Sequence, residues 1–136
     1  MRILIVDDDA DVVAFFSEAA KAKGYTDIDT ARTAEAALGC AVRSEYDLIT
    51  LDIRMPGVSG LEILSMLRNM SPHAVIALVS GYFTDPMPET AAGCADVLIS
   101  KPVSLDTLSG LLDGAARIVS TIADIRALGD VSVATE

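Results

Sequence analysis

The chain has 136 residues, a net charge of −10 at neutral pH and a pI near 4.3. This length predicts one domain that buries roughly two-thirds of the surface of its unfolded chain. The negative charge argues against direct binding of nucleic acids or anionic membranes, because both need a basic protein face. No apolar run approaches the roughly 20 residues of a membrane-spanning helix. Asp7, Asp8 and Asp9 interrupt the first apolar run, so we expect no signal peptide and a cytoplasmic protein.

Cysteine and histidine are rare in the chain, which has Cys40, Cys94 and His73. The two cysteines are too far apart in the sequence to form a metal or redox motif. A single histidine disfavours a Ser-His-Asp or Cys-His catalytic site and a histidine-based zinc site.

The apolar pattern alternates between strands and helices. Strands are predicted at residues 3–6, 25–30, 47–51, 74–79 and 97–100, and helices at residues 11–23, 33–43, 59–70 and 105–128. Pro86 and Pro88 predict a short or irregular helix within residues 84–93, after a mobile loop at residues 80–88. Strands separated by helices pair in parallel through right-handed crossovers. The pattern therefore predicts an α/β fold with a doubly wound, five-stranded parallel sheet, (βα)5, and an extended last helix.

The last predicted helix is longer than packing on a sheet requires. Two sets of apolar residues repeat in it every seven positions: Leu111, Ile118 and Ile125, and Leu108, Ala115 and Ile122. This is the a/d spacing of a helix seam. Two interpretations stay open: a helix that lies along its own core with a frayed end, or a helix that projects and forms a homodimer. Residues 129–136 are predicted to be a disordered C-terminal tail.

Polar side chains stand where the predicted strands end. They are Asp7, Asp8, Asp52, Ser80 and Lys101. Carboxyl ends of parallel strands meet at one edge of the sheet, so these side chains should converge. Two carboxylates about 4 Å apart repel by roughly 4 kcal/mol at an effective dielectric constant of 20. The cluster therefore predicts a site for Mg²⁺, which prefers hard oxygen ligands, and Mn²⁺ could substitute.

Each of these residues also has an ordinary structural explanation. An aspartate before a helix is usually an N-cap, which is the expected role of Asp9 and an alternative for Asp8. A lone serine after a strand, or a lone Lys-Pro pair, is common. The prediction of a functional site therefore rests on the set of five, at the ends of four strands, and not on any single member.

The chain resembles the receiver domains of two-component response regulators over residues 2–116. The matching segments are residues 3–8 (ILIVDD), 47–60 (DLITLDIRMPGVSG), 79–81 (VSG) and 100–102 (SKP). The second segment is the most specific, because Asp52, Pro56 and Gly60 stand at the family's spacing. The resemblance implies a flavodoxin-like three-layer sandwich, with the receiver domain at residues 1–128.

The resemblance also implies the chemistry of the site. Asp52 would be the phosphoacceptor, receiving a phosphoryl group from a sensor histidine kinase or a histidine phosphotransfer protein. Asp7 and Asp8 would hold Mg²⁺ together with Asp52 and the backbone carbonyl of Arg54.

Further roles follow from the same resemblance. Lys101 would pair with the phosphoryl oxygens, Ser80 would hydrogen-bond one of them after transfer, and the Lys101–Pro102 peptide would be cis. Arg54 and Tyr82 would tune water access to the phosphoryl group. The family usually has an aromatic switch residue where this chain has Leu98, so that coupling is in doubt here.

The implied function is a phosphorylation-activated signalling switch, a stand-alone receiver or phosphorelay element that binds a downstream protein. It would not be an enzyme beyond its own phosphorylation and dephosphorylation. One alternative is a phosphatase of the haloacid-dehalogenase type that uses Asp7 and Asp9. Another is a receiver-like fold that signals without phosphorylation. Acceptance of a phosphoryl group on Asp52 would distinguish the phosphorylation-activated switch from both alternatives.

Overall fold

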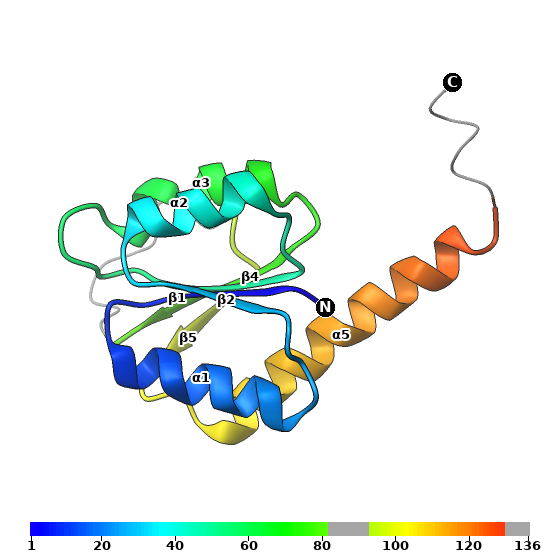
Figure 1. Ribbon diagram of the computed structural model, residues 1–136, viewed down its shortest axis with the longest axis horizontal. Coiled ribbons are helices and arrows are strands. Elements are labelled where there is room, and N and C mark those ends of the chain that lie inside the picture. The colour runs from blue at the N-terminus through cyan, green and yellow to red at the C-terminus, as the bar shows by residue number, and fades with distance from the viewer. Residues whose placement is uncertain (82–92, 130–136) are drawn as a thin grey trace.

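The structure, a computed structural model, describes residues 1–81 and 93–129. Five parallel strands form one sheet in the order β2-β1-β3-β4-β5. The strands are β1 (Ile3–Val6), β2 (Ile28–Ala31), β3 (Leu48–Asp52), β4 (Val75–Ser80) and β5 (Val97–Ser100), and the described helices are α1 (Ala10–Ala22), α2 (Ala34–Arg43), α3 (Gly60–Met70) and α5 (Leu105–Arg126). Figure 1 shows three layers, with α2 and α3 on one face of the sheet and α1 and α5 on the other. The predicted fold class is confirmed.

The predicted elements differ from the observed ones mainly at their ends. Strand β2 begins three residues later than predicted, because Gly24 and Tyr25 complete the end of α1. Gly24 has a φ of +93°, and the backbone N–H of Tyr25 donates to the carbonyl of Ala20 at 3.0 Å. This is a Schellman-type helix end. The predicted fourth helix and mobile loop fall largely on residues 82–92, outside the described residues, as do tail residues 130–136.

The central strands are continuous runs of buried residues because helices cover both faces of the sheet. Leu4 and Ile49 point to the α2/α3 side. Ile3, Ile5 and Leu48 point to the α1/α5 side. Each fully buried leucine or isoleucine stabilises the fold by about 1.5–3 kcal/mol. The ends of β1 and β3 are therefore held at fixed positions.

The fully buried residues of helix α5 all lie in its first half. Leu108 and Ala115 are each 2% exposed, whereas Ile118 and Ile125 are 45% and 60% exposed. In Figure 1 the second half of α5 runs out beyond the three layers. The helix continues to Arg126, so the projecting interpretation describes its path. Among the described residues, no helix is long and apolar enough to span a membrane.

Gly60 opens α3 directly against the end of β3. A Cβ atom on Gly60 would collide with the backbone carbonyl oxygen of Asp52. The backbone N–H of Gly60 also donates to the carbonyl of Ile53 at 3.0 Å. The lack of a side chain at Gly60 therefore lets α3 begin close to the Asp52 backbone.

Replacing Gly60→Ala should lower the free energy of unfolding by about 2–3 kcal/mol, because α3 must move away from Asp52. The control is Gly39→Ala in α2, where the nearest atom to an added Cβ is in the Arg43 guanidinium at 3.8 Å. This control should raise the free energy of unfolding by about 0.5–1 kcal/mol. Urea denaturation measures both. Equal effects of the two substitutions would contradict the close approach at Gly60.

Candidate functional site

The five residues predicted from the sequence lie at the carboxyl edge of the sheet. Asp7 and Asp8 directly follow β1, Asp52 ends β3, Ser80 ends β4 and Lys101 directly follows β5. The pairing of β3 with β4 runs through Asp52, and that of β4 with β5 runs through Ser80. The parallel register therefore aligns the strand ends.

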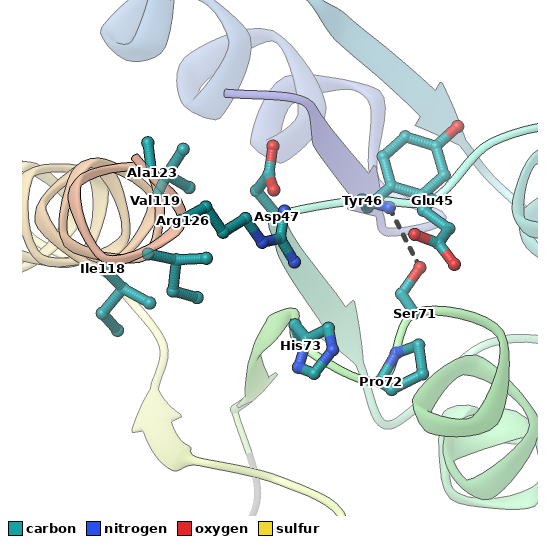
Figure 2. Close-up of a pocket in the computed structure, with 11 residues that line it drawn as sticks. Glu45, Tyr46, Asp47, Ser71, Pro72, His73, Ile118, Val119, Ala123 and Arg126 are labelled. Atoms are coloured by element: carbon teal, nitrogen blue, oxygen red, sulfur yellow. Dashed lines mark hydrogen bonds between the residues drawn. The ribbon is translucent and has the colours of Figure 1, made fainter. Parts of the chain in front are cut away.

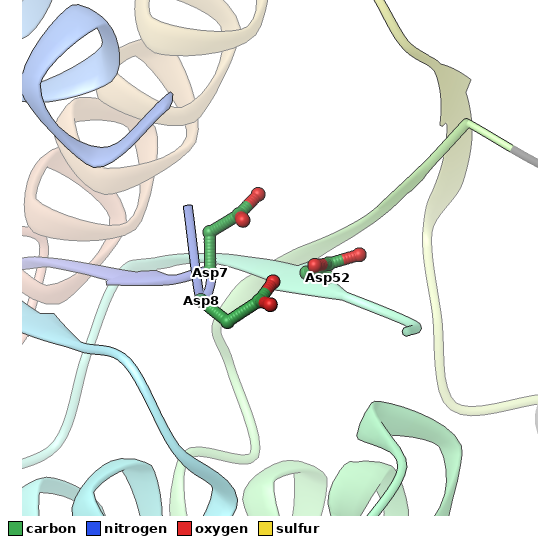
Figure 3. A group of neighbouring side chains, drawn as sticks. All are labelled: Asp7, Asp8 and Asp52. Carbon is green, nitrogen blue, oxygen red and sulfur yellow. The ribbon is translucent and has the colours of Figure 1, made fainter. Parts of the chain in front are cut away.

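Three carboxylates form the centre of this edge. One oxygen from each of Asp7, Asp8 and Asp52 lies within 4.8 Å of the other two. Figure 3 shows these side chains close together, coming from the ends of β1 and β3. Asp7 is 2% exposed and Asp52 is 3% exposed, so water screens their repulsion poorly. A group of hard oxygen donors with excess negative charge fits a divalent cation such as Mg²⁺.

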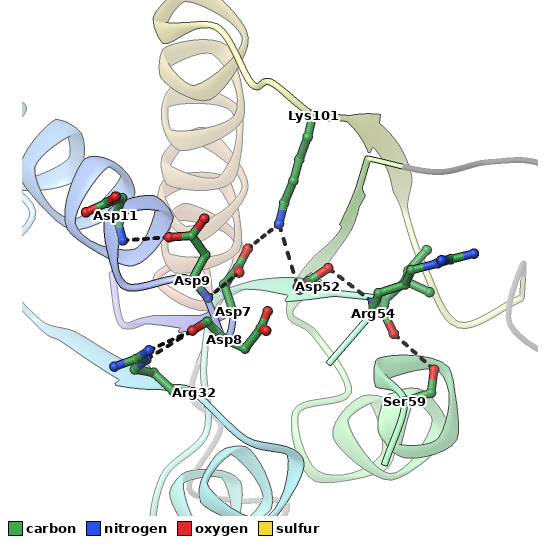
Figure 4. A network of polar contacts seen from close by, with 10 residues as sticks. Asp7, Asp8, Asp9, Asp11, Arg32, Asp52, Arg54, Ser59 and Lys101 are labelled. Carbon is green, nitrogen blue, oxygen red and sulfur yellow. Dashed lines mark hydrogen bonds and ion pairs between the residues drawn. The ribbon is translucent and has the colours of Figure 1, made fainter. Parts of the chain in front are cut away.

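Lys101 supplies positive charge to two of these carboxylates. Its Nζ lies 2.8 Å from Oδ2 of Asp7 and 3.6 Å from Oδ2 of Asp52, and Figure 4 shows it between them. Burial by itself would lower the pKa of Lys101, but the hydrogen bond and charge of Asp7, with the charge of Asp52, outweigh burial and raise it. The Lys101–Pro102 peptide is cis, as predicted.

Asp52 is the carboxyl group most affected by this environment. Burial, followed by the charge of Asp7, raises its pKa to about 7, against the opposing effects of Lys101 and of the Arg54 backbone N–H. That N–H donates to Oδ1 of Asp52 at 3.1 Å. Asp52 of the metal-free chain is therefore partly protonated near neutral pH.

The segment after β1 is fixed by hydrogen bonds that hold Asp7 and Asp8. The N–H of Asp9 donates to Oδ1 of Asp7 at 2.9 Å. The Asp9 side chain accepts from the N–H of Asp11 at 2.9 Å, so Asp9 is an N-cap as predicted. The guanidinium of Arg32 donates to the carbonyl oxygen of Asp8, with the shorter contact at 2.8 Å. Arg32 was missed in the sequence, although it directly follows β2 and so stands at the same edge.

The loop after β3 is fixed by Ser59. Its hydroxyl donates to the carbonyl of Ile53 at 3.0 Å and accepts from the N–H of Leu61 at 3.2 Å. Ser59 is therefore the N-cap of α3, and its hydrogen bond to Ile53 also holds the segment that carries Arg54 in place (Figure 4).

Ser80 was predicted to hydrogen-bond the phosphoryl group and Tyr82 to tune water access, while Leu98 stands where the family usually has its aromatic switch residue. Ser80 is 1% exposed, and its carbonyl accepts from the N–H of Lys101 at 2.9 Å. Leu98 lies on β5 and is 43% exposed. Tyr82 lies outside the described residues.

Comparisons with known proteins agree with this geometry. A sequence model of the response regulator receiver domain matches residues 3–113. The transcriptional regulatory protein TcrA of Mycobacterium tuberculosis is 29% identical over 119 residues, which cover 86% of this chain and 46% of TcrA. The sensor protein ArcB of Escherichia coli is 31% identical over 82% of this chain and 15% of ArcB. The crystal structure of the response regulator TrrA from Thermotoga maritima, in complex with Mg²⁺ and BeF, is 34% identical with a TM-score of 0.73, covering 84% of this chain and 97% of that one.

The chain belongs to the response regulator receiver domain family. It is therefore a receiver domain of the two-component systems, whose role is phosphorylation-dependent signalling, and the haloacid-dehalogenase alternative is not supported. The chain spans about half the length, or less, of the curated relatives it matches.

The raised pKa of Asp52 predicts how stability changes with pH in the metal-free chain. The folded chain binds this proton more tightly, with a pKa of about 7 against an ordinary value of 3.8. Its contribution to stability is therefore full below about pH 4 and declines as pH rises towards 7. At pH 8 without metal, Asp52→Asn should raise the free energy of unfolding by on the order of 1 kcal/mol.

The control for this measurement is Glu18→Gln, which removes one negative charge from an exposed position on α1. It should change the free energy of unfolding by less than about 0.5 kcal/mol. Urea denaturation with a chelator, at pH 5 and pH 8, measures both variants. An Asp52→Asn chain that is less stable than the parent at pH 8 would contradict the raised pKa.

Proposed function

We propose that this chain is a phosphorylation-activated switch that accepts a phosphoryl group on Asp52. The donor is the phosphohistidine of a sensor histidine kinase or of a histidine phosphotransfer protein. The observation that supports the proposal is the position of the Asp52 carboxyl group, at the end of β3, with two more carboxylates and the Lys101 ammonium around it.

The chemistry that we propose needs positioning and charge balance more than a general base. An ionised Asp52 oxygen forms the bond to phosphorus, the phosphorus–nitrogen bond of the phosphohistidine breaks, and the histidine nitrogen keeps the electron pair. Lys101, already at the site, pairs with the phosphoryl oxygens, and the Ser80 hydroxyl hydrogen-bonds one of them. The chain promotes only its own phosphorylation and dephosphorylation, so it is not an enzyme acting on other substrates.

We propose that Asp7, Asp8, Asp52 and the carbonyl of Arg54 hold Mg²⁺, with Mn²⁺ as a possible replacement ion. The donor set supports this, since all its members offer hard oxygen ligands. When bound, the ion would supply positive charge to the carboxylates and the phosphoryl oxygens. Asp7 would exchange its contact with Lys101 for the ion, which frees Lys101 for the phosphoryl group.

The switch that we propose starts at Ser80 and Lys101. Phosphorylation adds about −1.5 to −2 charge and three acceptor oxygens. Ser80 moves towards them and repacks the segment after β4, while Leu98 takes no part as an aromatic switch. Arg54 and Tyr82 tune water access and so the lifetime of the phosphoryl group. Movement of Lys101 also shifts the start of α5, because Ser104, the N-cap of α5, lies only three residues after Lys101.

An apolar cavity beside the acceptor supports docking of the phosphodonor protein. Its volume is about 430 Å³, and it is lined by Asp11, Val12, Phe15, Phe16, Lys101, Pro102 and Val103. Phe15 is 39% exposed in spite of its large apolar ring. Because Lys101 belongs to both the cavity and the site, a protein bound here lies next to Asp52. We propose that the donor places an apolar side chain in this cavity.

Residues 1–128 form the receiver domain, which works in the cytoplasm. Its partners are the phosphodonor, a downstream protein and a second copy of the chain, bound through the last helix. The acidic surface supports neither nucleic-acid nor membrane binding as its direct role.

Incubation with acetyl phosphate and Mg²⁺ should attach a single phosphoryl group per chain, and Asp52→Asn should abolish the label while the circular dichroism spectrum is unchanged. The control is Asp106→Asn, at an exposed position in the first turn of α5, which should be labelled normally. Intact-mass spectrometry detects the product. Retained label in Asp52→Asn would identify another acceptor, and multiple turnover of phosphomonoesters through Asp7 would favour a phosphatase.

Phe15→Asp should slow transfer from a phosphohistidine protein donor by roughly ten-fold or more, because it places a charge in the docking cavity. Labelling by acetyl phosphate should stay the same, since a small donor needs no docking surface. Val42→Asp, at a 74% exposed position on α2, is the control and should change neither rate. Equal loss with both donors would show that Phe15 supports the site itself and not a partner.

A further inference from the structure

The exposed side of α5 carries an uncharged stripe that differs from the predicted seam. Leu108 and Ala115, which belong to that seam, are buried in the chain's own core. The uncharged positions that are not fully buried alternate in spacing between three and four residues: Leu111, Gly114, Ile118, Thr121, Ile125 and Leu128. Leu111 and Gly114 are half-buried, and Leu111 also packs against the core, whereas the other four are exposed. This spacing is that of a coiled-coil seam. The structure thus corrects the predicted seam by rotating it to another side of the helix.

The second half of this stripe is too apolar for a helix surrounded by water. Ile118, Ile125 and Leu128 are 45%, 60% and 87% exposed. Isolated helices shorter than about 12–15 residues are marginal in water, and most helices in proteins depend on tertiary packing. The projecting half of α5 therefore lacks, within the described chain, the packing that such a helix ordinarily has.

The flank of the projecting half next to the stripe faces the chain's own loops. Figure 2 shows Val119, Ala123 and Arg126 on one side of a pocket, with Asp47 and His73 on the other. The pocket has a volume of about 210 Å³. This flank is therefore directed towards the body, with Ile118 at its border with the stripe. The rest of the stripe's second half, Thr121, Ile125 and Leu128, does not line this pocket.

The first half of the stripe lies in a groove, whereas its second half protrudes. The groove has a volume of about 560 Å³ and lies between α5 and the edge strand β5. Leu111, Gly114 and Ile118 line it on the helix side, and Val97 and Ile99 line it on the strand side. A hollow at one end and protruding side chains at the other are complementary when two copies of the helix run in opposite directions.

We infer that a second copy of this chain pairs with α5 in an antiparallel arrangement. Leu111 then lies opposite Leu128 of the second copy, and Ile118 lies opposite Thr121. The protruding Ile125 and Leu128 of each copy enter the groove beside β5 of the other. The paired stripes run for roughly 26 Å, at 1.5 Å per helical residue. This specifies the homodimer proposed above and does not depend on phosphoryl transfer.

The charges beside the stripe favour the antiparallel direction. Arg117 and Asp124 lie on the same flank, seven residues apart. In the antiparallel arrangement Arg117 of each copy faces Asp124 of the other, so the pairing forms two equivalent ion pairs. In a parallel arrangement Arg117 would face Ile122, and neither charge would gain a partner. Flanking charges of this kind select the direction of helix pairs.

Sedimentation equilibrium between about 1 μM and 500 μM, with reductant, should show a dimer of the parent chain. Ile125→Asp should raise the dissociation constant by roughly 100-fold, because it places a charge in the apolar seam. Ser120→Asp is the matched control, since it adds the same charge to an exposed position on the same helix outside the stripe, and it should leave dimerisation unchanged. Circular dichroism checks that all variants fold.

Charge reversal tests the direction. Arg117→Asp should weaken the dimer by roughly ten-fold, since two like-charged pairs replace two ion pairs. Adding Asp124→Arg should restore the affinity, because the antiparallel arrangement then regains both pairs in reversed order. A monomeric parent chain, a dimer that is unaffected by Ile125→Asp, or a double variant that is not restored would each overturn the inference. Acetyl phosphate labelling of Ile125→Asp should remain normal, so failure of the pairing and failure of the phosphoacceptor proposal are distinguished.

Discussion

The mutual repulsion of buried carboxylates at the end of the sheet is the constraint on which the site depends. Asp7 and Asp52 are almost fully buried and share one ammonium group, that of Lys101. One positive charge does not balance these two carboxylates and that of Asp8. Burial in the first place, and the charge of Asp7 in the second, therefore raise the pKa of Asp52, because protonation reduces the buried charge. A bound cation would reduce the negative charge without protonation, so metal binding would favour the ionised form of Asp52, the proposed nucleophile.

The fold keeps these repelling carboxylates close together. Buried aliphatic side chains on both faces of the sheet hold the ends of β1 and β3, and parallel pairing with β4 holds β5 in register. The charged groups therefore cannot move apart without disturbing the core. Gly60 and Ser59 bring the start of α3 against the end of β3, while Asp9 fixes the segment that carries Asp7. The backbone that brings the carboxylates together therefore also prevents them from moving apart.

Much of this could be predicted from the sequence, because it depends on local pattern. Apolar runs identify the strands, and the residue after each run identifies the site, so Asp52 and Lys101 were found without coordinates. Features set by three-dimensional packing were not found. The sheet, and not the heptad pattern, decides that Leu108 and Ala115 are buried. Only one of the two predicted sets, Leu111, Ile118 and Ile125, therefore belongs to the stripe on α5. The role of Arg32 was not predicted, because it binds the backbone carbonyl of Asp8, and every residue has such a carbonyl whatever its side chain.

The coupling between cation and nucleophile can be measured directly as proton release. Calorimetric titration with Mg²⁺ at pH 7, repeated in buffers of different ionisation enthalpy, gives the number of protons released per bound ion. With Asp52 half protonated beforehand, binding should release about half a proton, and Asp52→Asn should release almost none. Tight Mg²⁺ binding without any proton release would show that Asp52 is already fully ionised, and would contradict the raised pKa that burial and the Asp7 charge give it.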